Sequence, residues 1–121
     1  MSKSLTKNQI LVLNTLTSAP KPLTAYSLLD RLKEHGLKAP PQIYRALEKL
    51  LAVGLIHKLE SINSFVACQH SDCAHQLAGF AICDGCDQVS EIIDDNLESQ
   101  IRSVAKTAGI VPRKSTMEIH G

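Results

Sequence analysis

The sequence has no run of apolar residues long enough to cross a bilayer, although 44% of its 121 residues are hydrophobic. Its start, MSKSLTKNQI, lacks the apolar segment that follows the basic residues of a secretory signal peptide. Internal repeats and low-complexity linkers are also absent. These absences argue against membrane insertion, export and repeat architectures, and we expect a cytoplasmic protein.

The sequence is short and has only four cysteines. At this length the chain forms one ordinary domain or two very small ones, which are marginally stable unless a metal or a partner subunit adds stability. Cysteines of a protein that is not exported lie in a reducing compartment, where they bind metals more often than they form disulfides. We therefore expect a metal-bound oligomer.

The overall charge of +1 is unevenly distributed. Residues 1–60 contain nine Lys or Arg and four acids, a net charge of +5, whereas residues 61–121 contain four Lys or Arg and eight acids, a net charge of −4. The basic half is suited to nucleic acid, and the acidic half contains most of the Cys and His residues. Two separate tasks are indicated.

Residues 1–69 show the pattern of three short helices followed by a hairpin. Apolar residues recur at helical spacing after capping or proline residues, and Gly36 and Gly54 provide helix stops. We expect helices over 6–18, 24–36 and 42–53, and strands over 55–59 and 65–68. This order predicts a winged helix-turn-helix DNA-binding domain.

Residues 70–121 predict a small α/β dimerisation domain. Strands are expected over 77–82 and 89–93, a helix over 96–108, and a last strand within 116–120. So short a segment buries little apolar surface alone, so its sheet is expected to be completed by a second copy. The predicted fold class is α+β, with the winged helix first and the dimerisation domain second.

The third helix has the residues expected of a DNA-reading element. Gln42, Tyr44, Arg45 and Lys49 lie off its apolar stripe. Gln42 is the best candidate for a base contact, because its amide can make two hydrogen bonds to adenine, while Tyr44 and Arg45 suit phosphates or thymine methyls. Tyr26, early in the second helix, could also reach DNA. The alternative is an ordinary solvated helix face.

Zinc ligands recur in the hairpin and the second half. His57, Cys68, His75 and Glu91 would supply two neutral imidazoles, one thiolate and one carboxylate, which together neutralise Zn²⁺. Such a site would fix the wing to the dimerisation domain. The two DNA-binding domains of a dimer would then have the spacing of the half-sites in a palindromic duplex. His70 and Cys73 remain alternatives to His75.

Cys83 and Cys86 form a Cys-x-x-Cys pair, with Gly85 allowing a tight turn between them. This spacing is typical of half of a structural zinc site, but no second Cys-x-x-Cys follows. A thiol redox pair, a degenerate site, and a pair completed by Cys73 or His70 are the alternatives.

Four segments resemble the ferric uptake regulator superfamily, and its zinc uptake regulators most: LTAYSLLDRLKEHG, KAPPQIYRALEKLLAVGLIHKLESINSFVAC, FAICDGCDQVSEI and MEIHG. The resemblance implies a zinc-dependent homodimeric repressor of metal-uptake genes. It implies regulatory zinc ligands at His57, Cys68, His75 and Glu91, and DNA contacts at Tyr26, Tyr44 and Arg45. It also implies that Cys83 and Cys86 are half of a four-thiolate site.

The sequence departs from this pattern in three places. It stops at Gly121, where relatives continue into a second Cys-x-x-Cys, so we expect a truncated C-terminus and an incomplete structural site. It lacks the extra N-terminal helix of many relatives. The loop QHSDCAHQLAG leaves the third regulatory ligand open among His75, His70 and Cys73.

Three other functions compete with a zinc-dependent repressor. The same fold could sense iron, manganese or peroxide, although a cysteine among the ligands favours zinc. An enzyme, either a thiol oxidoreductase or a zinc hydrolase, is disfavoured because the pair lacks the strand-to-helix position of redox sites and four ligands leave no place for catalytic water. The third is a DNA-binding module that does not respond to metal.

Overall fold

The computed structural model describes residues 5–68, 77–92, 94–113 and 115–121. The chain divides into two compact units, Met1–Cys73 and Ala74–Gly121. The predicted domain boundary after residue 69 falls within 69–76, outside the described residues. None of the described helices is long and apolar enough to span a membrane.

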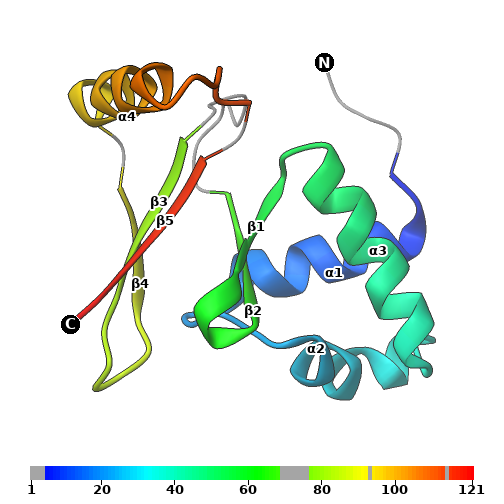
Figure 1. The fold of residues 1–121 in the computed structure, drawn as a ribbon. Helices are drawn as coiled ribbons and strands as arrows, with labels where there is room; N and C mark the ends of the chain where they lie inside the picture. Colours follow the sequence, from blue (N-terminus) through cyan, green and yellow to red (C-terminus); the bar gives the residue numbers. More distant parts are fainter. Residues whose placement is uncertain (1–4, 69–76, 93, 114) are drawn as a thin grey trace. The chain divides into compact units, whose positions relative to one another are not determined.

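The first unit begins with three helices (Figure 1), α1 (Lys7–Ser18), α2 (Ala25–Leu32) and α3 (Pro40–Ala52). The predicted capping box is confirmed at α1: the Thr6 hydroxyl accepts the backbone N–H of Gln9, and the Gln9 side chain accepts the N–H of Thr6. A 3-10 helix, Lys33–His35, extends α2 to Gly36, which takes the left-handed conformation at φ 102°. Helix α3 begins two residues before the predicted position, since proline is compatible with the first helical turn.

A β-hairpin follows α3 and forms the wing. Strands β1 (Ile56–Leu59) and β2 (Ser64–Ala67) are antiparallel, with His57 opposite Val66. The connection contains a 3-10 helix, Glu60–Ile62, and a left-handed residue, Asn63, at φ 49°. Leu23 also pairs with Phe65 through two backbone hydrogen bonds, so the segment before α2 is fixed to the wing.

The core of the first unit is formed where the helices meet the wing. It consists of side chains from all three helices and both wing strands, together with Leu23 and Leu37. In α3 the buried residues are Ile43, Ala46, Leu47 and Leu50, as their helical spacing predicted. Burial of each of the leucine and isoleucine side chains contributes about 1.5–3 kcal/mol. This packing fixes which face of α3 is left for solvent.

The second unit is a three-stranded sheet and one helix. Its elements are β3 (Leu77–Ile82), β4 (Val89–Ile92), α4 (Asp95–Thr107) and β5 (Ser115–His120), and the strand order is β4-β3-β5. Strand β3 pairs antiparallel with β4 and parallel with β5, because α4 carries the chain back to the start of the sheet (Figure 1). Asp94 caps α4 by accepting the N–H groups of Asn96 and Leu97.

The second unit has a small core. Its buried apolar side chains among the described residues are those of Phe80 and Ile82. Helix α4 is amphipathic, yet none of its residues is buried. So small a core gives little stability by itself.

Candidate metal centres and nucleic-acid interface

Helix α3 presents a polar face to solvent. Tyr44, Arg45 and Lys49 are exposed on it, while their neighbours Ile43 and Ala46 are buried in the core. The backbone of α3 is therefore fixed by packing on one side and leaves an aromatic and two cationic side chains available on the other. A rigid helix with such a face can contact DNA bases and phosphates.

Gln42 has a structural role that the sequence reasoning did not find. Its Oε1 atom accepts the backbone N–H groups of Lys38 at 2.9 Å and Ala39 at 3.1 Å. Residues Lys38–Gln42 are thereby closed into a turn at the start of α3. A two-pronged contact with adenine needs both Oε1 and Nε2, so Gln42 could make it only by releasing this turn.

Other polar groups lie on the surface of the first unit. Tyr26 in α2 is 71% exposed, so its side chain does not pack in the core of the unit. Lys58 of β1 lies 5.8 Å from the centroid of the Phe65 ring and 3.5 Å from a carboxylate oxygen of Glu60. Asp30 and Lys33 form an exposed ion pair at 3.3 Å, which contributes little stability.

The wing brings two of the predicted metal ligands together. His57 lies in the middle of β1, and Cys68 directly follows β2, where its N–H donates to Leu55 O at 2.9 Å. One ligand atom of His57 and Sγ of Cys68 lie within 4.8 Å of each other. Both residues are half-buried, and Nε2 of His57 is shielded from solvent. An imidazole nitrogen and a cysteine sulfur this close suit a soft divalent cation such as zinc, which would bind Cys68 as its thiolate.

The other predicted regulatory ligands belong to the second half of the chain. Glu91 lies in β4 opposite Phe80 of β3, and one of its carboxylate oxygens is shielded from solvent. A shielded carboxylate is costly unless a positive charge or hydrogen bonds compensate it. His75 and its alternatives His70 and Cys73 lie outside the described residues.

Cys83 and Cys86 lie in the exposed turn between β3 and β4. Both are free thiols. The N–H of Cys83 donates to Gln88 O at 2.9 Å, and the N–H of Asp87, at φ 62°, donates to Cys83 O at 2.8 Å. A hydrogen bond from the Cys86 side chain, followed by those from the backbone of Cys86 and Gly85, lowers the pKa of the Cys83 thiol; the nearby carboxylate of Asp84 opposes this effect. A turn that stabilises one thiolate beside a second thiol suits zinc, which binds cysteine as thiolate.

The end of β5 contacts this turn, which no sequence motif indicated. His120 Nδ1 lies 3.3 Å from Asp84 Oδ1. The N–H of Asp84 also donates to Gly121 O at 2.7 Å, and the N–H of Gly121 donates to Ile82 O at 3.1 Å. The parallel pairing of β3 with β5 creates these contacts.

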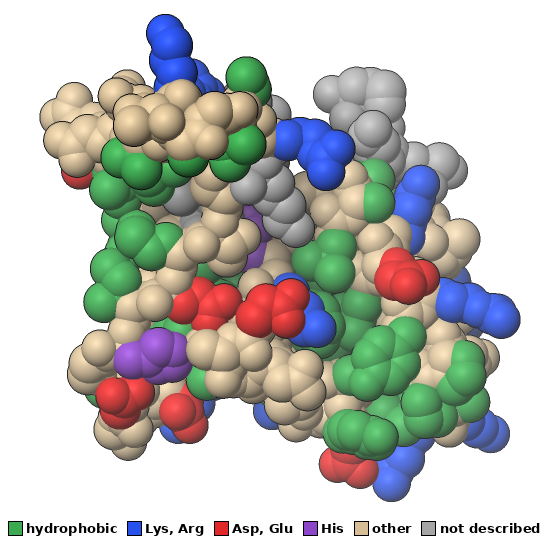
Figure 2. All heavy atoms as spheres, in the orientation of Figure 1, with side chains coloured by type: hydrophobic (Ala, Val, Ile, Leu, Met, Phe, Trp, Pro, Cys, Tyr) green, Lys and Arg blue, Asp and Glu red, His purple; other side chains and the backbone are tan. Residues whose placement is uncertain are grey.

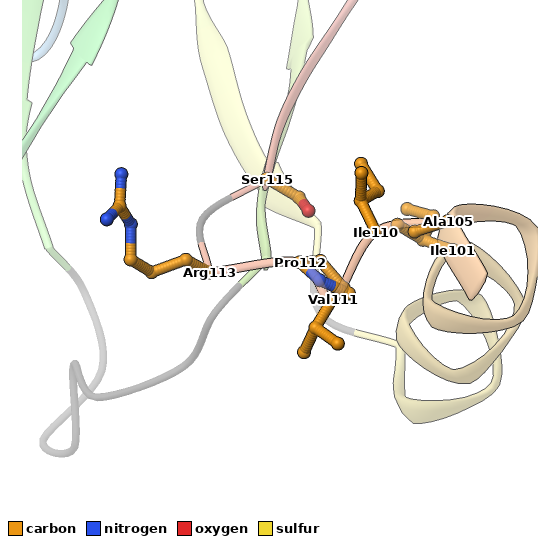
Figure 3. A pocket seen from close by; sticks show the side chains of 7 residues that line it. All are labelled: Ile101, Ala105, Ile110, Val111, Pro112, Arg113 and Ser115. Carbon is orange, nitrogen blue, oxygen red and sulfur yellow. The ribbon is translucent and has the colours of Figure 1, made fainter. Parts of the chain in front are cut away.

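The second unit exposes an apolar surface around α4. Val104, Ile110 and Val111 are exposed there, Val111 to 93%, and Ile119 of β5 is exposed elsewhere on the same unit. Figure 2 shows apolar side chains at the surface along α4. A shallow pocket of about 500 Å³ lies between the end of α4 and the following segment, lined by Ile101, Ala105, Ile110, Val111, Pro112, Arg113 and Ser115 (Figure 3). Contiguous exposed apolar surface of this kind is typical of an interface.

The sequence profile described as the Ferric uptake regulator family matches residues 3–120. The chain belongs to this family. It is 36% identical over 118 residues to the zinc uptake regulation protein of Escherichia coli (strain K12), a match that covers 97% of the chain and 69% of that protein. The resemblance to this family that the sequence motifs indicated is therefore confirmed, and one relative within it is a zinc uptake regulation protein.

Solved structures of zinc uptake regulators are similar to this family member over nearly its whole length. The crystal structure of holo XcZur matches with a TM-score of 0.90 and 43% identity, covering 100% of the chain and 84% of that structure. A zinc uptake regulator in complex with zinc and DNA matches with a TM-score of 0.91 and 36% identity, covering 98% of the chain and 79% of that structure. The predicted α+β fold with an N-terminal winged helix is therefore confirmed.

Proposed function

We propose that the chain is a zinc-responsive transcriptional repressor of metal-uptake genes that binds a palindromic DNA operator as a homodimer. The main support is the position of His57 and Cys68: two zinc-type ligands lie together on the wing of a DNA-binding unit. A metal bound there can influence DNA binding directly. Its relatives support the same function, because one of them is structurally known in complex with both zinc and DNA.

The regulatory zinc site consists of His57, Cys68, His75 and Glu91. A bound zinc ion would supply a cross-link between side chains of the two units. His57 and Cys68 fit this role because their ligand atoms already lie within 4.8 Å of each other, and a thiolate with two imidazoles is a softer ligand set than the oxygen ligands preferred by manganese. Glu91 would contribute the negative charge that, with the Cys68 thiolate, neutralises the ion.

The wing couples zinc binding to DNA binding. His57 and Cys68 belong to the hairpin, and the hairpin is joined to the start of α2 through Leu23 and Phe65. Restraint of the wing therefore restrains the DNA-reading unit. If the restrained arrangement alone fits both halves of a palindrome, zinc and operator strengthen each other's binding by the same factor.

The DNA contacts are assigned to Tyr26, Tyr44, Arg45 and Lys49, with Gln42 in a secondary role. The first four are exposed on α2 and α3. Arg45 can make two hydrogen bonds to guanine, and Lys49 suits a phosphate. Because Oε1 of Gln42 is occupied by the turn before α3, its Nε2 donor is the group left to contact DNA.

Homodimerisation is assigned to the second unit. Its α4 has an apolar face without buried residues, and Val111 is nearly fully exposed beside it. A second copy would cover this face and extend the sheet that the described residues form in the order β4-β3-β5. A zinc ion at Cys83 and Cys86 would stabilise the same unit, in a cytoplasmic setting that keeps both thiols reduced.

We further propose that the chain binds ligands and does not catalyse a reaction. The Cys-x-x-Cys pair lies in a turn between two strands, whereas redox pairs of the thioredoxin type lie at the start of a helix. A four-ligand zinc site also has no open position for a reacting water. Turnover of a disulfide substrate that stops in a Cys83→Ser, Cys86→Ser double variant would contradict this proposal.

The proposal is tested by zinc-dependent binding to duplexes selected from a random pool. Fluorescence anisotropy at buffered free zinc should show an affinity that falls at least tenfold on chelation. His57→Ala and Cys68→Ser should bind DNA weakly with or without zinc, while His35→Ala, which removes an exposed histidine from the same unit, should behave as the parent chain. Activation by Fe²⁺ or Mn²⁺ at a lower free concentration than by Zn²⁺ would overturn the zinc assignment, and affinity unchanged by a chelator would overturn metal control.

A further inference from the structure

The Cys83-x-x-Cys86 turn is connected to the C-terminal strand through Asp84. The backbone of Asp84 donates to Gly121 O at 2.7 Å, while its side chain lies 3.3 Å from His120 Nδ1. The side-chain partner, His120, is the last residue of β5 and lies 36 residues later in the sequence, and Gly121 directly follows it. Asp84 is thus attached to β5 by main chain and side chain together.

The contacts of Asp84 restrain the turn that contains the thiols of Cys83 and Cys86. Asp84 immediately follows Cys83, and the turn is exposed on all of its residues from Cys83 to Gln88. An exposed turn has many conformations, and two thiolates share one metal ion only when the turn keeps them at one separation. A ligand pair that is already restrained binds metal more tightly than a pair that must be ordered upon binding.

We propose that His120 is a positioning residue for the metal site at Cys83 and Cys86: by contacting Asp84 it holds the turn against the end of β5. This inference rests on the proposed zinc site at that pair. His120 does not bind the metal itself. Its imidazole donates from Nδ1 to the Asp84 carboxylate and so orders the turn whether or not the metal is present.

The experiment isolates the pair with Co²⁺ as a spectroscopic probe. The 121-residue chain with Cys68→Ser and Cys73→Ser keeps Cys83 and Cys86 as its remaining cysteines. Thiolate-to-cobalt absorption then reports on this site, and a chelator competition gives its affinity. Absence of thiolate-to-cobalt absorption in this background would refute the zinc site itself, and the positioning role with it.

In that background His120→Ala should weaken Co²⁺ binding about three- to fivefold, as expected for the loss of a partly exposed side-chain hydrogen bond. Asp84→Ala should have the same effect, and the double variant should be no weaker than either single variant, because both remove one contact. Asp84→Asn, which keeps the acceptor oxygen, should restore the affinity. His35→Ala is the matched control.

Three results would overturn the positioning role. One is unchanged affinity in His120→Ala. Another is a shifted cobalt d–d band in His120→Ala but not in Asp84→Ala, because that would make His120 a ligand. A third is equal weakening by Asp84→Asn and Asp84→Ala, since the amide keeps the hydrogen bond. Circular dichroism of each metal-free variant separates these outcomes from unfolding.

Discussion

At the scale of single residues, the chemistry of Cys83 depends on its neighbours in the turn. Donors from Cys86 and Gly85 lower the pKa of the Cys83 thiol, so it ionises at lower pH than an ordinary cysteine. The thiolate is the nucleophile in alkylation. In the metal-free chain we therefore expect Cys83 to be alkylated faster than Cys86 near neutral pH, as measured by mass spectrometry after a short iodoacetamide pulse.

The Cys86→Ala variant supplies the control for this prediction. It removes the first and largest cause of the lowered pKa, so the pH at which Cys83 reacts at half its maximal rate should rise. A Cys83 rate profile that is identical in both chains would show that the Cys86 side chain has no such effect. Zinc should protect both thiols in the parent chain.

Predictions about single residues were confirmed where the interacting residues are close in the sequence. The capping box of Thr6 and Gln9 spans four residues, and the stop at Gly36 follows from its own backbone freedom. The contact of His120 with Asp84 could not be predicted, because it depends on the parallel pairing of two distant strands. The regulatory ligand set remains a prediction, since His75 lies outside the described residues.

At the scale of secondary-structure elements, the start of α3 depends on one side chain. Gln42 Oε1 accepts two backbone N–H groups before the helix, so Gln42→Ala should lower the free energy of unfolding by about 1 kcal/mol. Gln42→Glu keeps an acceptor there and places a negative charge at the helix N-terminus, where it is favourable. Urea denaturation should show destabilisation in the alanine variant and parent-like stability in the glutamate variant.

Measurements of DNA affinity distinguish the role of Gln42 in capping α3 from a direct contact with DNA. The glutamate variant should bind the operator more weakly despite its stability, because its charge repels phosphates. If both variants are as stable as the parent, the capping role is wrong. If the operator affinity of Gln42→Ala falls no further than its smaller folded fraction explains, direct base reading by Gln42 is excluded.

The elements themselves followed from periodicity, but their pairing did not. Apolar residues at helical spacing indicated α1, α2, α3 and α4 to within a few residues, and β3 was predicted with its observed bounds. Strand order within the second sheet could not be predicted, since the sequence gives no signal for the parallel pairing of β3 with β5. That pairing decides which residues surround the Cys-x-x-Cys turn.

At the scale of the whole molecule, the second unit needs a partner to cover α4. Val111 is 93% exposed, so Val111→Asp should leave the chain folded but place a charge in the proposed interface. Sedimentation equilibrium should show a dimer for the parent chain and a shift of at least tenfold towards monomer for the variant. Ser103→Asp, on the exposed opposite side of α4, is the matched control and should remain dimeric. Equal dimerisation of both variants would place the interface elsewhere.

The uneven charge of the molecule makes a separate prediction about DNA binding. Residues 1–60 have a net charge of +5, and Glu48 and Lys49 are both exposed on α3. A lysine that contacts a phosphate releases counterions on binding, so Lys49→Gln should weaken binding to all sequences and reduce the slope of log affinity against log salt by about 1.

Glu48→Gln should strengthen binding, most at low salt, because it removes a negative charge from the face that approaches DNA. Anisotropy titrations from low to high salt measure both effects. Parallel salt dependences in the parent chain and both variants would mean that this face of α3 does not approach the phosphates, and the assignment of α3 as the DNA-reading helix would then be wrong.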